Sequence, residues 1–203
     1  ECTFFSHYVG EKCFNSYYQE CCNEKKTFLS KIQELPFSNE WIARELCQCI
    51  PTGSVVHLGI FNTLRSWNMN DVTQDIDVDC NVGGFGIDGA LSTSIGASLA
   101  TPQKIHFCCC GDLAFFYDMN SLCNRHVGKN IRILVINNGR GVEFRNYSHP
   151  AYIYGEYADS YIAAGGHNGN QSKDLIKNYV EALGFLYYSA NSKEEFNTIK
   201  NIF

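Results

Sequence analysis

Continuous apolar runs alternate with helical patterns through the second half of the chain. The runs at 104–110 and 131–137 are short and unbroken, which is typical of strands in a parallel sheet covered on both faces. Between them, residues 113–128 have helical spacing that ends near Gly128. The three segments together predict a β-α-β unit.

Further segments extend this pattern in both directions. Residues 54–60 are β-branched enough for a first strand, and residues 185–190 predict a last one. Helices are expected at 39–50 after the cap Ser38, at 89–101, at 173–184, and at 193–203 after a capping box of Ser192 and Glu195. The sequence therefore predicts an α/β fold with a doubly wound, mostly parallel sheet and helices on both faces.

The predicted domain begins near Pro36. Residues 1–35 are aromatic and rich in cysteine and are expected to form helix and loop, with no role that we can assign. Residues 36–203 carry the alternating strands and helices. We therefore divide the chain into an N-terminal helical or linker segment, 1–35, and a main domain, 36–203.

Composition and charge favour small-molecule chemistry. The formal net charge is −5 and there is no basic run, so a nucleic-acid surface is not expected. No stretch approaches the roughly 18 apolar residues of a membrane span, and the first residues lack the layout of a signal peptide. We therefore expect a cytoplasmic protein without a membrane span. Since the sequence does not begin with Met, we expect a processed product or a piece of a longer protein.

The chain contains 11 cysteines, but none of them form a Cys-x-x-Cys pair. A zinc ribbon or a thioredoxin motif is therefore not expected. Cys108, Cys109 and Cys110 are adjacent in a predicted strand, where neighbouring side chains point to opposite faces. Because three such thiols cannot converge on one ion, we interpret most cysteines as free thiols that serve as small apolar residues.

Polar residues follow both strands of the β-α-β unit. Gly111 and Asp112 come after the first, and Asn138 comes after the second. The carboxyl ends of neighbouring parallel strands lie at one edge of a sheet, where ligands bind. Carboxylate and amide oxygens suit Mg²⁺, which completes its shell with phosphate oxygens and water. Gly111 would let the backbone approach those phosphates.

This pattern resembles the cofactor-binding motif of thiamine-diphosphate-dependent enzymes. The stretches "VGGFGIDGALSTSIG", "GDLAFFYDMNSL" and "VINNGRG" have the order and spacing of the diphosphate-binding domain in that family, in particular its menaquinone-pathway branch. The stretch "NEWIARELCQCIPTGSVVHLGI" resembles the start of the domain, so the similarity covers about 38–203. The resemblance implies thiamine diphosphate and Mg²⁺ as cofactors.

The resemblance also implies roles for individual residues. Asp112, Asn138 and a backbone carbonyl near Arg140 would hold Mg²⁺, and Ile87 would wedge under thiamine diphosphate and bend it. Arg65 matches a family arginine that contacts a substrate carboxylate, for which a guanidinium is suited because it binds in a bidentate way. The implied cofactor-binding residues are Gly86, Ile87, Asp88, Gly111, Asp112, Leu113, Asn138 and Arg140.

Three residues depart from the family pattern near the implied substrate site. Residues 59–61 read "GIF" where the family has "GNS", and Val82 replaces a second substrate arginine. The change at Val82 removes one anion contact and leaves the cofactor residues untouched. A synthase that decarboxylates a 2-oxo acid and transfers the carbanion equivalent is the first expectation. An acetolactate-synthase-like enzyme or a simple 2-oxo acid decarboxylase is the alternative that Phe61 and Val82 favour.

The resemblance places the activating glutamate in a separate pyrimidine-binding domain, usually of another subunit. Nothing in these 203 residues supplies that domain, so we expect no catalytic residue here and no activity from this chain alone. The expected partners are the missing pyrimidine-binding domain, further copies in a dimer or tetramer, and a 2-oxo acid. A non-catalytic cofactor-binding domain is an alternative from another class.

Plainer interpretations stay open for several side chains. A surface salt bridge explains Arg65 as well as a substrate contact does. Ile87 next to glycines can be a core residue. Glu143 and His149 could face a substrate, but the sequence favours solvated loop residues for both.

Overall fold

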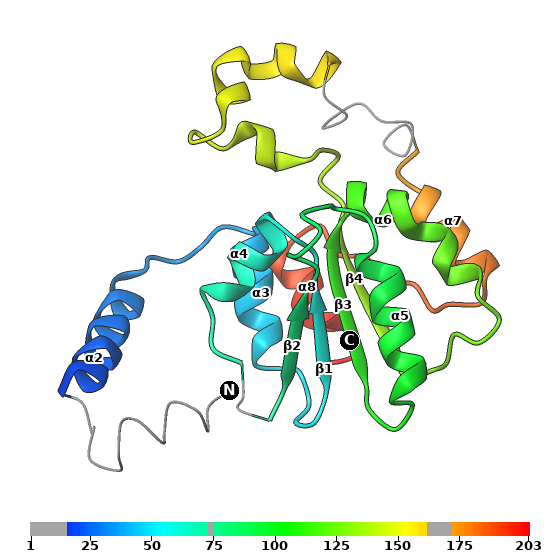
Figure 1. The fold of residues 1–203 in the computed structure, drawn as a ribbon, viewed down its shortest axis with the longest axis horizontal. Helices are drawn as coiled ribbons and strands as arrows, with labels where there is room; N and C mark the ends of the chain where they lie inside the picture. Colours follow the sequence, from blue (N-terminus) through cyan, green and yellow to red (C-terminus); the bar gives the residue numbers. More distant parts are fainter. Residues whose placement is uncertain (1–15, 73–74, 162–171) are drawn as a thin grey trace. The chain divides into compact units, whose positions relative to one another are not determined.

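The computed structural model describes residues 16–72, 75–161 and 172–203. The chain divides into two compact units, Glu1–Pro36 and Phe37–Phe203, and each is described by itself. In the first unit, helix α2 spans Ser16–Lys31 and buries none of its residues. Among the described residues, the second unit contains the strands and the remaining helices (Figure 1).

The second unit is built on a parallel sheet of four strands in the order β2-β1-β3-β4. The strands are β1 Val55–Leu58, β2 Asp77–Cys80, β3 His106–Gly111 and β4 Ile131–Ile136. Val56 of β1 pairs with Val78 of β2 and with Phe107 of β3, and every strand pair is parallel. The chain leaves β1 toward β2 and then crosses to β3, so the order reverses between β1 and β3. This is the switch point at which ligands of such sheets bind.

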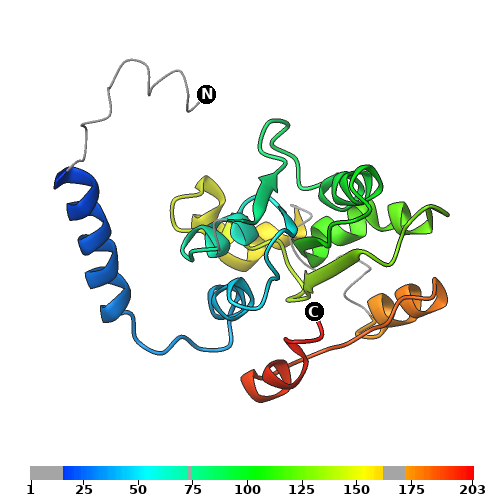
Figure 2. The same cartoon turned by 90° about the horizontal axis from the view of Figure 1, so that it is seen from below.

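Helices cover both faces of the sheet, as predicted. On one face, α5 (Ala90–Ala100), α6 (Asp112–Asp118) and α7 (Leu175–Ala182) share an apolar cluster with Cys108 and Cys110 of β3. On the other, α3 (Asn39–Cys47) and α8 (Lys193–Ile199) pack Trp41 against Phe196, whose ring centroids are 5.6 Å apart. Figure 2 shows α5 on one side of the strands and α3 and α8 on the other. The predicted α/β fold class is confirmed.

The cysteine run of β3 forms part of this core. Cys108, Cys109 and Cys110 are fully buried free thiols. Burial raises the pKa of the Cys109 thiol well above its ordinary value and that of Cys47 to about 12. Across the described ranges, no three His, Cys, Asp or Glu side chains are grouped as a metal site would need. The three thiols are buried in the apolar core, and their interpretation as core residues holds.

Several predicted elements differ from those observed. Residues 185–190 were expected to form a strand, but they have no strand partner; Phe185 and Tyr187 instead pack against the apolar cluster. Strand β2 and helix α4 (Asn62–Asn68) were not predicted. The helix expected at 113–128 begins at Asp112 as α6 and changes at Met119 into the short 3-10 helix η1 (Met119–Cys123).

Two more 3-10 helices follow β4, η2 (Val142–Arg145) and η3 (Pro150–Ser160), the latter broken by a kink at Gly155. Within the described residues, no helix is long and apolar enough to span a membrane.

Candidate cofactor-binding site

Asp112 is the centre of the predicted site and lies where β3 becomes α6. Its side chain is only 1% exposed. Carboxylate oxygen Oδ1 accepts a hydrogen bond from the Leu113 N–H at 2.8 Å, and Oδ2 accepts one from the Gly139 N–H at 2.7 Å. The second bond ties the end of β3 to the loop after β4, so the two strand ends that were predicted to be neighbours are in contact.

The loop after β4 turns sharply at Gly139. Gly139 has a φ of +80°, a left-handed conformation that favours glycine. The side-chain oxygen of Asn138 accepts a hydrogen bond from the Arg140 N–H at 3.3 Å. This turn points the Gly139 N–H at Asp112 and keeps Asn138 at the same edge of the sheet.

The space beside Gly111 is open. A Cβ added to Gly111 would meet no atom within 4 Å, so the fold itself does not require glycine there. A ligand that approaches the backbone closely would need the space that a side chain at position 111 would fill. Together with the hard oxygen donors of Asp112 and Asn138, this fits a diphosphate with its Mg²⁺. An ion at this edge would have one carboxylate ligand, so amide and carbonyl oxygens and the phosphates would complete its shell.

The loop before α5 contains the other implied cofactor residues. A Cβ on Gly86 would lie 2.3 Å from Oδ1 of Asp88, so a larger residue there would make the Asp88 side chain move. Gly89 caps α5 with a φ of +83°. Ile87 is only partly buried and is not among the core residues. The plain core interpretation of Ile87 therefore does not hold, although its contact with a cofactor stays a prediction.

Arg65 is engaged within the chain. Its guanidinium forms a bidentate ion pair with the Glu143 carboxylate, in which Nη2 donates to Oε1 at 3.1 Å and Nη1 donates to Oε2. Nη1 also donates to Asn62 at 3.3 Å, and the guanidinium lies 5.8 Å from the centre of the Phe61 ring. The hydrogen bond to Glu143 raises the pKa of Arg65. Glu143 is thus held by an arginine, and the substrate role of Arg65 stays a prediction.

Comparisons of the sequence with known proteins identify relatives of this chain. A 2-succinyl-5-enolpyruvyl-6-hydroxy-3-cyclohexene-1-carboxylate synthase of Bacteroides fragilis is 34% identical over 170 residues, which is 84% of this chain and 29% of that protein. The synthase of the same name from Desulfotalea psychrophila is 38% identical over 146 residues, or 72% of this chain and 26% of that protein. No family model matches the chain.

A solved structure of a thiamine diphosphate-dependent enzyme has a similar fold. The thiamine diphosphate-dependent 4-hydroxybenzoylformate decarboxylase of Rhodococcus jostii RHA1 superposes with a TM-score of 0.59 at 15% identity, over 84% of this chain and 31% of that one. The resemblance to thiamine-diphosphate-dependent enzymes is thus confirmed. The chain spans less than a third of the length of these relatives.

One side chain of the thiamine-diphosphate-enzyme motif has a contact that sequence reasoning missed. Asp118, at the end of α6, accepts a hydrogen bond from the Ser92 N–H in the first turn of α5 at 2.6 Å. It therefore fixes the start of α5, directly after the "GIDG" loop, against the helix that begins at Asp112. The available signal was the "YD" at 117–118 within "GDLAFFYDMNSL".

Proposed function

We propose that residues 37–203 form the diphosphate- and Mg²⁺-binding domain of a thiamine-diphosphate-dependent enzyme. The observation that carries the proposal is the hydrogen bond from Gly139 to the buried Asp112, because it joins the ends of β3 and β4, which both carry oxygen donors, and β3 borders the switch point of the sheet. The open backbone at Gly111 supports it.

In this proposal Asp112, Asn138 and the carbonyl of Arg140 would hold Mg²⁺. The buried Asp112 carboxylate supplies the negative charge, which a divalent cation would neutralise, and the Asn138 amide supplies a second hard donor. Gly111 and Leu113 would place backbone close to the diphosphate. The fixed turn at Gly139 keeps these donors together before the cofactor arrives, so that little ordering is needed on binding.

The "GIDG" loop would contact the rest of the cofactor. Ile87 is partly exposed and can lie under the ring system, while Gly86 and Asp88 set the shape of the loop. When bound, thiamine diphosphate supplies an electron sink for the decarboxylation of a 2-oxo acid. The residues of this chain bind and orient the cofactor. The activating glutamate would come from a pyrimidine-binding domain outside this chain.

The whole enzyme would decarboxylate a 2-oxo acid and transfer the carbanion equivalent to an acceptor, as a cytoplasmic dimer or tetramer. The relatives' names support a synthase of the menaquinone type. Phe61 and Val82 favour the second candidate, an acetolactate-synthase-like enzyme or a simple 2-oxo acid decarboxylase, because one expected arginine is lost. A panel of 2-oxo acids assayed with the full-length enzyme separates these, and no turnover of any of them would favour a non-catalytic binding domain.

The metal assignment is tested in the full-length protein by calorimetry with thiamine diphosphate, with and without Mg²⁺. Asp112→Ala and Asn138→Ala should both abolish Mg²⁺-dependent binding. The exposed Asn138 guards against a folding defect, since its removal opens no core. Asp77→Asn is the matched control: Asp77 begins β2 at the opposite edge of the sheet, paired with Lys104 at 2.7 Å. Unchanged binding in both site variants would refute the assignment.

A further inference from the structure

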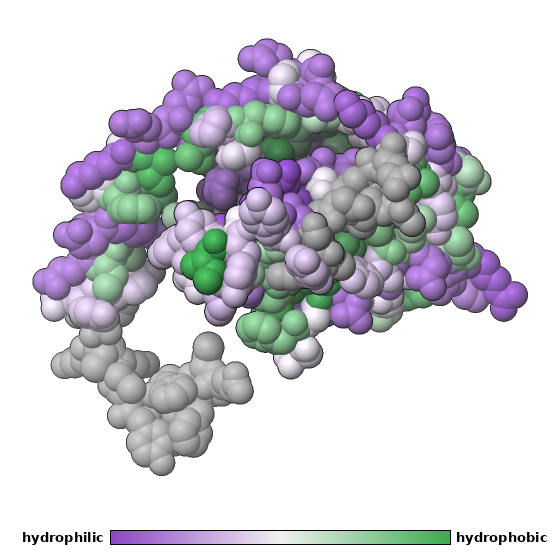
Figure 3. Space-filling view, turned by 90° about the horizontal axis from the view of Figure 1, so that it is seen from above, coloured by the Kyte–Doolittle hydropathy of each residue, from purple (hydrophilic) through white to green (hydrophobic). Residues whose placement is uncertain are grey.

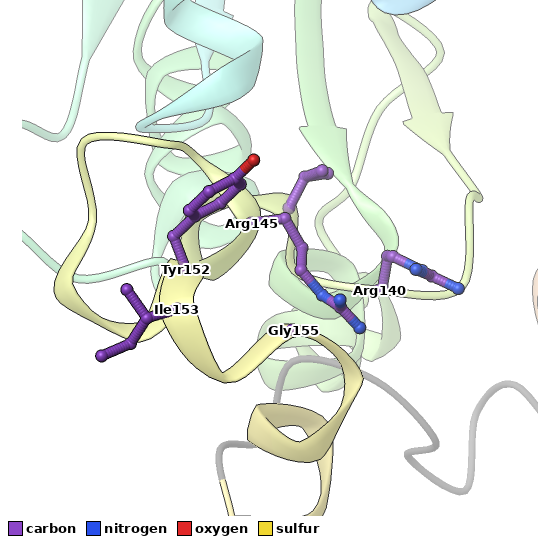
Figure 4. A pocket seen from close by; sticks show the side chains of 6 residues that line it. Arg140, Arg145, Tyr152, Ile153 and Gly155 are labelled. Atoms are coloured by element: carbon purple, nitrogen blue, oxygen red, sulfur yellow. The ribbon is translucent and has the colours of Figure 1, made fainter.

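The segment after β4 contains a pocket to which the cofactor proposal gives no role. It has a volume of about 730 Å³ and is lined by Arg140, Val142, Arg145, Tyr152, Ile153 and Gly155. This is within the usual range for small-molecule sites. In Figure 4, Arg140 comes from the loop after β4, Arg145 extends toward Gly155, and Tyr152 and Ile153 come from η3.

The two arginines give the pocket a positive wall. The guanidinium of Arg140 is exposed and forms no hydrogen bond or ion pair with any described residue. Arg145 is mostly buried and donates from Nη2 to Asp159 at 2.7 Å. Its Nε is buried and has no hydrogen-bond partner among the described residues. Asp159 neutralises only one of the two cations.

The residues that line the pocket include two arginines and no carboxylate. Glu143 lies in η2 between the two arginines in sequence, but its carboxylate is held by Arg65 on α4. A guanidinium binds carboxylates and phosphates through paired N–H groups, which makes such a wall selective for those anions.

The other lining residues with side chains are apolar or aromatic. Val142 and Ile153 supply aliphatic surface, and Tyr152 supplies a ring with a hydroxyl. Ile153 is 78% exposed and Tyr152 is 51% exposed, so both are available to a ligand. Figure 3 shows the molecule from above the view of Figure 1. A strongly hydrophobic spot lies left of the centre, among weakly polar surface.

We infer that this pocket binds the acidic group of a small organic acid, with the carboxylate on Arg140 and Arg145 and its apolar body against Tyr152 and Ile153. This inference rests on the proposed function only where it identifies the acid as the enzyme's substrate. One of its lining residues, Arg140, follows Asn138 of the proposed metal site by two positions. It would supply an anion contact of the kind that is lost at Val82.

Benzoate and benzamide are the probes, because they share shape and differ in charge. Their binding to the full-length protein is measured by ligand-observed NMR without thiamine diphosphate or Mg²⁺. We expect benzoate to bind at least about tenfold more tightly than benzamide, since loss of one charged contact costs on the order of 1.4 kcal/mol or more. Equal binding of the two probes would overturn the inference.

Variants assign the binding to the pocket. Arg140→Gln and Arg145→Gln should each weaken benzoate about tenfold and leave benzamide unchanged, and Ile153→Ser should weaken both probes. Arg125→Gln is the matched control, since Arg125 is exposed and, within the described part of the chain, its side chain donates to His126 alone. No loss with either pocket arginine, or equal loss with Arg125, would contradict the assignment.

Asp159→Asn distinguishes binding from mere support of the fold. Because Asp159 competes with the ligand for Arg145, its neutralisation should tighten benzoate severalfold, whereas a purely structural pair predicts weaker binding. Weaker binding in a folded Asp159→Asn protein would overturn the inference. Since these titrations contain no cofactor, they can fail while the Asp112 calorimetry succeeds, and the reverse also holds.

Discussion

The thiol of Cys109 offers a direct test of the interpretation of the cysteine run. Cys109 is fully buried in β3, and its thiol forms no hydrogen bond to a described residue; burial, with smaller contributions from Cys108 and Cys47, raises its pKa well above the ordinary value. Replacing it by alanine removes one apolar atom and leaves a small void, which costs about 1 kcal/mol. Replacing it by serine loses the same atom and also buries a hydroxyl, which costs about 1–3 kcal/mol more.

Urea unfolding followed by circular dichroism measures both variants. With a urea dependence of about 2 kcal/mol per M, the serine variant should unfold about 0.5–1.5 M earlier than the alanine variant. Cys123→Ser is the control, because Cys123 is exposed and contacts the Tyr179 hydroxyl at 3.2 Å, a hydrogen bond that serine can keep. It should stay within about 0.5 kcal/mol of the unmodified protein. A serine variant as stable as the alanine variant would refute the apolar role.

Two further predictions concern the site and the core. Gly139→Ala and Gly53→Ala should each cost about 1–2 kcal/mol in urea unfolding, because both glycines have a φ of +80°, but only Gly139→Ala should weaken thiamine diphosphate binding in calorimetry. Burial lowers the pKa of His106, so the unfolded chain binds a proton more readily below about pH 6.5. Stability should therefore fall as the pH decreases through that range, and His106→Gln should flatten the decline; an unchanged slope would contradict the assignment.

The strands that could be predicted are those whose own side chains fill the core. β3 and β4 are continuous apolar runs, and the structure finds them at His106–Gly111 and Ile131–Ile136. β2 was missed because "DVDC" is mostly exposed at the edge of the sheet and is held by backbone pairing with β1. Residues 185–190 have the composition of a strand, but they form no strand pairing and contribute Phe185 and Tyr187 to the apolar cluster instead. Strand propensity alone does not make a strand.

The parts of the site that could be predicted are those that follow from the order of strands and helices along the chain. Parallel strands that are adjacent in the sheet end at one edge, so the neighbourhood of Asp112 and Asn138 followed from the β-α-β unit. The ion pair between Arg65 and Glu143 joins residues 78 positions apart, and no local pattern encodes it. The pocket of Arg140 and Arg145 also depends on how the segment after β4 folds back, which its sequence of tyrosines and glycines did not reveal.

The two edges of the proposed site therefore differ in what determines their geometry: backbone hydrogen bonds at one edge and side chains at the other. The Asp112 edge is fixed by backbone N–H groups from Leu113 and Gly139, so its geometry depends little on neighbouring side chains. The proposed substrate edge includes Phe61 and Val82, where the resemblance predicts polar groups. Because Glu143 engages Arg65, the guanidinium of Arg140, which has no partner among the described residues, is the cation that we propose for an incoming acid. A change of substrate with the cofactor site kept is the outcome that this division of roles predicts.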